Sequence, residues 1–483
     1  MHWLDILIFF IYMVIMLGIG FFFLRQNKSD DDYYVGGRSM GSMHVGLSVV
    51  ATDVGGGFSI GLGGLGFTMG ISGSWMLFTG LIGAWLSAVV LIPKVSKMSK
   101  LEGLYTFPQI FGLFYNKKVA LLAGIISAIG YLGFTSSQML AGAKLASATF
   151  VDLDLMTALF VMGVIAVVYT VMGGLKAVIY TDTVQWIILM AGLIFIGIPM
   201  GYHAIGGYDA IVQTLPPEFL RWDNLTWQML VNWAVTIIPI WFVGMTLYQR
   251  IYACKGPKEA QKAWFIAGLF EWPIMAIMGV VLGLFARVAA EQGMFDAVGY
   301  AGAGTMDEEI GLPLLLRDIL PVGLLGLMMS AYFSAILSTA DSCLMAASGN
   351  IVTDILGVKS TSEATSKSTL RMSQLITLGV GVAALILAST MENVLELMLY
   401  SYAFLVSGLL VPLVAALFGA RVSSTAAFWS MLVGGATTVG LSIAPIDLPL
   451  QLDPNVFGIS ASAAIFVILN SVTTKKTYAH DKL

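Results

Sequence analysis

The chain has 483 residues, of which 58% are hydrophobic and only 11% are charged, and its mean hydropathy is +0.87. Because a soluble domain carries about 25% charged residues, this composition excludes a soluble fold and predicts an all-α polytopic membrane protein. The net charge of −4 excludes little, since the charges are confined to loops, and two cysteines give no disulfide framework.

Apolar runs long enough to cross the hydrocarbon core, about 18 residues or more, predict thirteen transmembrane helices. In chain order they lie at approximately 4–24, 44–71, 74–93, 119–149, 155–173, 181–201, 227–249, 264–287, 319–349, 372–390, 396–418, 425–445 and 456–472. The second of them is interrupted by polar residues and glycines.

The charges in the loops indicate which side of the membrane each loop faces. With the N-terminus outside, nearly every Lys and Arg, including Arg250, lies in an inside loop; the exceptions are Lys144, in a span, and Arg221, Arg287 and Arg317, outside. Cytoplasmic loops carry an excess of Lys and Arg. We therefore expect a multi-pass protein of the plasma (inner) membrane with a cytoplasmic C-terminus. The outside run Asp307-Glu-Glu309 is expected to be a solvated face.

The order of the spans predicts internal symmetry. After the first span, five spans precede a polar outside loop at 202–224 and five follow it. An odd number of spans per repeat forces the two repeats into opposite orientations. The predicted parts are an extra first helix and inside loop at 1–40, a first repeat at 41–203, the outside loop and inverted second repeat at 204–420, and two additional helices with a cytoplasmic tail at 421–483.

The second span contains the stretch Ala51-Thr-Asp-Val-Gly-Gly-Gly57. Three consecutive glycines are poor helix formers, and the charge of Asp53 is costly in lipid. We therefore predict a helix that is broken at mid-depth. Its freed backbone carbonyls and Asp53 would line a site for an ion or a solute.

A second polar stretch lies within the span 319–349. Ser334, Ser338, Asp341 and Ser342 recur at spacings of three and four residues, so they share one helical stripe, and Thr339 adjoins it. Single hydroxyls on membrane helices are commonly packing residues. Five polar groups in nine residues instead predict a site for a hard cation such as sodium, which prefers hydroxyl, carbonyl and carboxylate oxygens.

Other chemistry is not indicated. Asp182 opens the span 181–201 and, from its position alone, is equally well a carboxylate that favours a helix N-terminus. The four histidines are scattered, so sodium is the only metal that we expect. No nucleophile–base pair is apparent, so the sequence predicts no enzyme. The expected partners are the lipid bilayer and a small-molecule solute, with no nucleic acid and no obligate protein partner.

Four motifs together resemble the sodium:solute symporter family: 51–57, Tyr180-Thr-Asp-Thr-Val-Gln185, 334–342 and Val35-Gly-Gly-Arg38. The similarity extends from about 40 to 420 in order and spacing. Within the family, the Val-Gly-Gly-Gly and Thr-Ala-Asp-Ser tracts resemble the branch that includes high-affinity choline transporters. The resemblance implies a five-plus-five inverted-repeat core of the leucine-transporter type and alternating access driven by Na+ as the coupling ion.

The resemblance also implies binding residues. Backbone carbonyls of two helices and two adjacent hydroxyls would form the main sodium site, which maps to Ala51, Val54, Ala335, Ser338 and Thr339. A second sodium site, present in some members, would map to Asp182, Ser338, Asp341 and Ser342. The substrate-facing positions would be Asp53, Gly56, Phe134, Gln138, Trp241 and Gln249.

Asp53 departs from the choline transporters, which place a tryptophan of an aromatic cage at this position. Proline-transporting relatives have an Asp there, and in them it serves sodium coupling. For this chain, sodium coupling and recognition of a cationic substrate both remain open.

The charged residues inside the predicted spans limit the charge that we expect the solute to carry. Asp53, Asp182 and Asp341 oppose a single deep basic residue, Lys144, so even two sodium ions would leave little positive charge to hold an anion. We expect sodium-coupled symport of a small cationic, zwitterionic or neutral solute. Two alternatives remain: a proton-coupled symporter on the same fold, with Asp182 or Asp341 as the proton carrier, and a sensor that binds solute without moving it.

Overall fold

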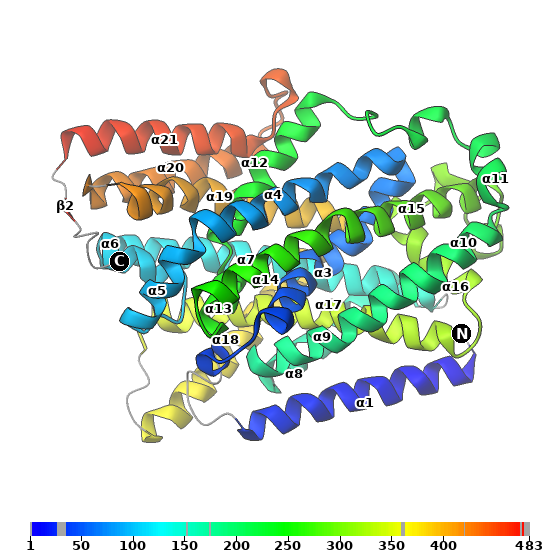
Figure 1. Ribbon diagram of the computed structural model, residues 1–483, viewed down its shortest axis with the longest axis horizontal. Helices are drawn as coiled ribbons and strands as arrows, with labels where there is room; N and C mark the ends of the chain where they lie inside the picture. The colour runs from blue at the N-terminus through cyan, green and yellow to red at the C-terminus, as the bar shows by residue number, and fades with distance from the viewer. Residues whose placement is uncertain are drawn as a thin grey trace.

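The computed structural model describes residues 2–26, 35–150, 153–172, 175–358, 363–419, 421–473 and 476–477. Long helices run side by side along one axis of the molecule (Figure 1). In the described residues, nine helical segments are long and apolar enough to cross a membrane, or ten if the bent pair of α12 and α13 is one span. Shorter apolar stretches lie at Trp3–Met16 and Leu155–Val168.

The first part of the chain forms α1 (Trp3–Gln26), α3 (Ser42–Met69), α4 (Trp75–Val90), α5 (Ile92–Glu102), α6 (Pro108–Phe114), α7 (Lys117–Thr149), α8 (Leu155–Met172), α9 (Leu175–Gly192), α10 (Ile198–Ala204) and α11 (Gly207–Thr214). The second part forms α12 (Trp227–Val243), α13 (Met245–Ala253), α14 (Pro257–Leu269), α15 (Ala276–Glu291), α16 (Gly311–Ile319), α17 (Leu324–Gly349), α18 (Glu363–Ala388), α19 (Val394–Phe418), α20 (Ser424–Ile443) and α21 (Pro454–Val472). The strands β1 (Arg421–Val422) and β2 (Lys476–Thr477) pair antiparallel.

Each predicted span falls on one of these helices or on a consecutive pair, so the predicted all-α fold is confirmed. α20 and α21 pack beside α19 at one edge of the bundle, and α1 lies at the opposite edge (Figure 1). The start of α1 and the end of α21 lie at opposite ends of the molecule, as an odd number of crossings requires. Part of the first inside loop, 27–34, and the end of the tail, 478–483, lie outside the described residues.

α1 is tied to α17 at its first turn. The Asp5 carboxylate accepts hydrogen bonds from the backbone amides of Gly323, at 2.6 Å, and Gly326, at 2.9 Å. These are free amides at the start of α17, where a carboxylate is favoured by the helix dipole. An added Cβ at Gly326 would lie 2.6 Å from the Asp5 backbone, so the two helices touch directly at this turn.

The predicted break in the second span is at Gly55, where φ is +41° and ψ is −156°. A side chain is rarely accommodated in this conformation, which glycine adopts at little cost. Space is also limiting, because an added Cβ at Gly55 would lie 2.8 Å from Gln138 Oε1 and 2.8 Å from Thr339 Cγ2. The glycine tract therefore both bends α3 and brings its backbone against α7 and α17.

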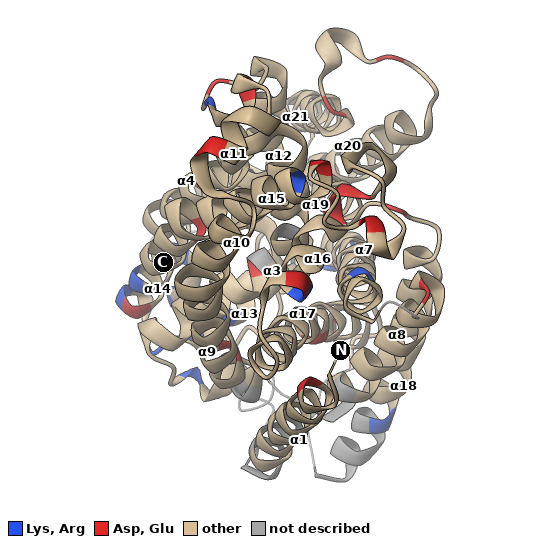
Figure 2. Cartoon of the chain, turned by 90° about the vertical axis from the view of Figure 1, so that its right-hand side faces the viewer, with Lys and Arg blue, Asp and Glu red and all other residues tan. Residues whose placement is uncertain are grey.

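The expected solvated face at 307–309 is wrong for Glu309, whose side chain is buried. Glu309 Oε2 lies 2.6 Å from Lys144 Nζ, and the carboxylate accepts the backbone amides of Val394 and Leu395 at 2.8 and 2.9 Å. Burial is favourable here because the first amides of α19 need acceptors and Lys144 needs a counter-charge. Asp307 remains partly exposed at 37%. Several acidic residues lie at the end of the bundle where α1 begins (Figure 2).

Candidate functional site

The break in α3 faces α17, and oxygen atoms of the two helices converge there. Thr339 Oγ1 donates to the carbonyl oxygens of Ala51, at 3.1 Å, and Ala335, at 3.2 Å. Val54, another predicted ligand through its backbone, lies one residue before the break. Two carbonyl oxygens and a hydroxyl are the donor types that a hard cation prefers. The structure thus brings together three of the five residues predicted for the main sodium site.

The other side-chain candidate, Ser338, points to the neighbouring helix α9. Its hydroxyl donates to Asp182 Oδ1, while Ser48 of α3 donates to Asp182 Oδ2 at 2.5 Å. Asp182 lies well inside α9, which already includes Leu175, so the alternative that it favours a helix N-terminus is wrong. It joins α3, α9 and α17 beside the α3 break.

Arg250 completes this cluster from α13. Its side chain is fully buried, and its Nη2 lies 3.5 Å from Asp182 Oδ2 and 3.2 Å from Ser342 Oγ. The guanidinium also donates to Ser48, at 3.0 Å, and to Thr52. The placement of Arg250 in an inside loop is therefore wrong, as is the count that made Lys144 the only deep basic residue. A buried carboxylate is stable only beside a compensating positive charge.

The residues predicted for a second sodium site are only partly assembled. Asp182 and Ser338 are in contact, but the Arg250 guanidinium takes the place of a cation between Asp182 and Ser342. Asp341 is fully buried, and neither of its carboxylate oxygens accepts a hydrogen bond from the described part of the chain. This arrangement fits an internal cation at the second site more directly than a bound ion.

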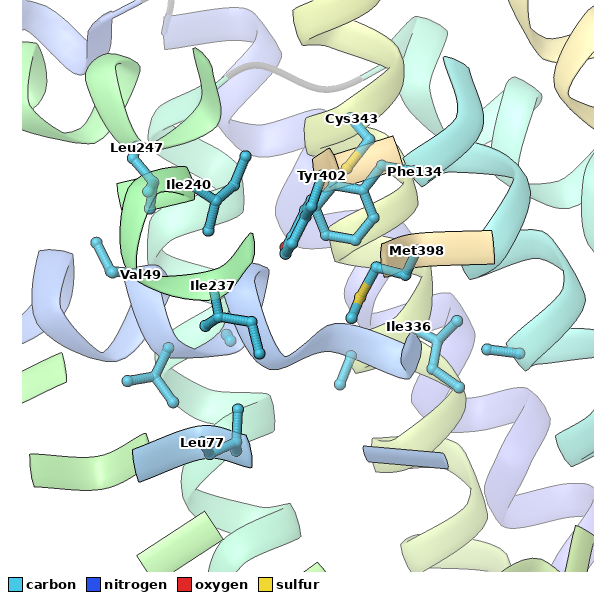
Figure 3. Packing of buried hydrophobic residues seen from close by; sticks show 14 of the residues in the cluster. Val49, Leu77, Phe134, Ile237, Ile240, Leu247, Ile336, Cys343, Met398 and Tyr402 are labelled. Carbon is cyan, nitrogen blue, oxygen red and sulfur yellow. The ribbon is translucent and has the colours of Figure 1, made fainter. Parts of the chain in front are cut away.

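Four of the six predicted substrate-facing residues gather at the α3 break. The Gly56 amide donates to Gln138 Oε1 at 2.7 Å. The Phe134 ring meets the Tyr402 ring edge to face, with centroids 5.1 Å apart, and the Tyr402 hydroxyl donates to Asp53 Oδ1 at 3.4 Å. Figure 3 shows Phe134, Tyr402 and Met398 together on one side of this bend. A polar backbone turn with an acid and an aromatic wall can hold a small polar solute.

The other two predicted positions lie elsewhere. Trp241 packs from α12 against Gly83 of α4, and its ring centroid is 6.3 Å from that of Trp264. This is the environment of a packing residue between helices. Gln249 is buried on α13, one residue before Arg250.

Sequence reasoning missed Glu271, which is fully buried in the irregular turn Phe270–Met275 between α14 and α15. An added Cβ at Gly80 of α4 would overlap its carboxylate. This turn packs against α3, and the Glu271 and Asp53 carboxyl groups are neighbours. The signal was available, since a carboxylate inside the apolar run 264–287 is itself an indication of a site.

Comparison with known proteins identifies the family. The sodium:solute symporter family model matches residues 33–434. The high-affinity proline transporter PutP of Bacillus subtilis (strain 168) is 28% identical over 439 residues, which cover 88% of this chain and 89% of that protein. Sodium/glucose cotransporter 1 of Ovis aries is 26% identical over 478 residues, covering 89% of this chain and 70% of that protein.

Solved structures share the fold. A Na+-coupled sialic acid symporter in a substrate-bound outward-open state matches with a TM-score of 0.78 at 19% identity, covering 98% of this chain and 99% of that one. Mhp1, a nucleobase-cation-symport-1 family transporter, matches in a closed conformation with a TM-score of 0.56 at 12% identity, covering 92% and 94%. These likenesses assign the five-plus-five inverted-repeat core. The chain belongs to the sodium:solute symporter family, and its function is the sodium-coupled symport of a small solute.

Proposed function

We propose that the chain couples sodium bound between α3 and α17 to uptake of a small cationic, zwitterionic or neutral solute by alternating access. The observation that carries this proposal is the convergence of Thr339 Oγ1 with the carbonyls of Ala51 and Ala335 at a broken helix. Val54 and Ser338 complete the proposed ligand set. Sodium bound there would hold α3 and α17 together, which is how an ion biases one conformation of a transporter.

The buried charges support a solute that is not an anion. Beside the α3 break, four buried carboxylates oppose one buried guanidinium: Asp53, Asp182, Glu271 and Asp341 against Arg250. Lys144 is already paired with Glu309. Two sodium ions would therefore still leave this region negative. An anionic solute would have to enter a low-dielectric site of its own sign.

Sodium dependence tests the proposal. We expect an inward sodium gradient at fixed pH to drive solute accumulation in proteoliposomes, and replacement of sodium by potassium to abolish it. A thermal-shift screen of small amines, amino acids and vitamins, with and without sodium, selects the solute, because a ligand that binds the native state stabilises it. L-proline and D-glucose are the first two solutes to test, given the named relatives.

Accumulation that is unchanged without sodium but lost without a proton gradient would contradict sodium coupling. It would favour proton coupling through a buried carboxylate, such as Asp341 or Asp182. Binding without counterflow across vesicles would instead indicate a sensor. Uptake of a dianion under a sodium gradient would contradict the proposed substrate class. We propose no catalytic role, no nucleic-acid ligand and no obligate protein partner.

We further propose that the protein lies in the plasma (inner) membrane with its N-terminus outside and its C-terminus inside. The proposed parts are the two repeats at 41–203 and 204–420, flanked by 1–40 and 421–483. The excess of Lys and Arg in the predicted inside loops supports this orientation.

Maleimide labelling of introduced cysteines should report this orientation directly. Both native cysteines are buried, and burial raises the pKa of the Cys254 thiol to about 12. Since only the thiolate reacts, a membrane-impermeant maleimide should leave the unmodified protein unlabelled near neutral pH. On intact cells it should label Ala301→Cys, at an exposed site, and spare the equally exposed Lys118→Cys until the cells are permeabilised. The reverse pattern would invert the proposed topology.

A further inference from the structure

Two broken helices each present a carboxylate to the same point in the protein interior. Asp53 lies two residues before the break at Gly55, and Glu271 lies one residue before the non-helical Trp272. The turn that carries Glu271 packs against α3, so the two carboxyl groups are neighbours. Both are buried, with Asp53 4% and Glu271 0% exposed. Gly80 has no side chain, and this leaves room for the Glu271 carboxylate.

This pair lacks a counter-charge among the described residues. Asp53 Oδ2 and both Glu271 oxygens accept no hydrogen bond from a described donor, and Asp53 Oδ1 has only the Tyr402 hydroxyl at 3.4 Å. Arg250 already forms an ion pair with Asp182 and hydrogen bonds to Ser48 and Ser342. Two ionised carboxylates side by side in a low dielectric repel each other strongly. The pair can avoid this repulsion by sharing a proton or by holding a positively charged group between its members.

The backbone strengthens the preference for a cation. Asp53 lies at the C-terminal end of the half-helix 42–54, and Glu271 lies two residues after the end of α14 at Leu269, where each helix breaks. Unpaired carbonyls give such an end a partial negative charge, which attracts cations. This effect is independent of the carboxylates and adds to theirs.

The surrounding side chains favour an organic cation over a bare metal ion. The bend beside Asp53 is lined by Phe134, Tyr402 and Met398, and Ile237 of α12 and Leu77 of α4 lie across from them (Figure 3). A bare metal ion would use the oxygen atoms here and leave these apolar side chains without a partner. An ammonium group can divide its N–H donors between two carboxylates, while the carbon body of the solute lies on the apolar wall.

We propose that Asp53 and Glu271 together bind the ammonium group of the transported solute, so that the substrate is an amine or an amino-group zwitterion. This inference rests on the proposed function, because it assigns the substrate class of that same transporter. It gives Asp53 a role in substrate recognition and leaves sodium to the Ala51, Ala335 and Thr339 oxygens.

Thermal-shift measurements with matched pairs of ligands test this proposal. They use the purified full-length protein in sodium buffer. Each ammonium probe is paired with an uncharged analogue of similar size: ethanolamine with ethylene glycol, and L-proline with cyclopentanecarboxamide. We expect at least one ammonium probe to stabilise the wild type more than its partner. Glu271→Gln should weaken apparent affinity for that probe by about 10- to 100-fold, the effect of one charge-assisted hydrogen bond. Its response to sodium should change little.

Two further variants separate recognition from folding. Without ligand, Glu271→Gln should be at least as thermostable as the wild type, because it removes a like-charge repulsion. Gly80→Ala keeps both carboxylates but displaces that of Glu271, so it should also weaken amine binding. Gly440→Ala, where an added Cβ meets no atom within 4 Å, should not.

The possible outcomes distinguish the two proposals. If no ammonium probe exceeds its uncharged partner, or if Glu271→Gln binds the amine as the wild type does, the amine assignment is overturned while sodium symport stands. If Glu271→Gln instead loses the sodium response, the pair is a sodium site and the assignment is again overturned. If sodium has no effect on the wild type in binding or uptake, it is the proposed function that fails.

Discussion

An Asp182→Asn variant is expected to lose about 3–5 kcal/mol of unfolding free energy, because it leaves the fully buried Arg250 guanidinium without its counter-charge. Arg250→Met should lose a similar amount by leaving Asp182 unpaired. The measurement is chemical denaturation of the purified protein in detergent, in potassium buffer. Potassium avoids stabilisation by sodium, which would obscure the comparison.

The double variant decides whether the two residues act as a pair. Asp182→Asn with Arg250→Met should recover much of the stability lost by either single change, because no isolated charge remains buried. Arg221→Met is the control, since its ion pair with Asp223 is solvent-exposed and should leave unfolding unchanged. Losses that simply add in the double variant would show that Asp182 and Arg250 are independent.

Replacing both Ser338 and Thr339 with Ala should raise the sodium concentration for half-maximal uptake by about 10- to 100-fold, the range typical for loss of groups that hold a metal ion. Thr339 bridges two carbonyl oxygens across α3 and α17, and Ser338 positions Asp182. The measurement is the sodium dependence of initial uptake in proteoliposomes, alongside the solute affinity at saturating sodium.

Ser348→Ala is the matched control, because Ser348 lies on the same helix and, among the residues that the structure describes, its hydroxyl bonds only the carbonyl of Met345, at 3.4 Å. It should keep the wild-type sodium dependence. If the double variant inserts normally and also keeps that dependence, Ser338 and Thr339 are not sodium ligands. A change in solute affinity alone would place them at the substrate site instead.

Much of the architecture was predictable because it depends on local patterns. Membrane-length apolar runs specify helices wherever they occur, so the spans lie where expected. The glycines before Phe58 specify a break because no other residue tolerates the backbone at Gly55. The stripe that includes Ser338 and Thr339 follows from helical periodicity, and it faces the break as predicted.

The charge partners were not predictable, because each lies far away in the sequence. Arg250 is 68 residues from Asp182 and one residue beyond the apolar run that marked its span, so it was assigned to a loop. Glu309 belongs to an acidic run that is typical of a solvated surface, yet it meets Lys144, 165 residues away. Which charge is buried is decided by tertiary packing, and an unaligned sequence carries no record of that packing.

The contact between Asp5 and the start of α17 would couple the first helix to any movement of α17 during transport. α17 carries the hydroxyls proposed to bind sodium, and its first amides are held by α1, which lies outside both proposed repeats. If α17 tilts when sodium leaves, either α1 moves with it or the hydrogen bonds to Asp5 break. Removal of Asp5 would free these amides, so we expect a truncation at the N-terminus to change how α17 moves during transport.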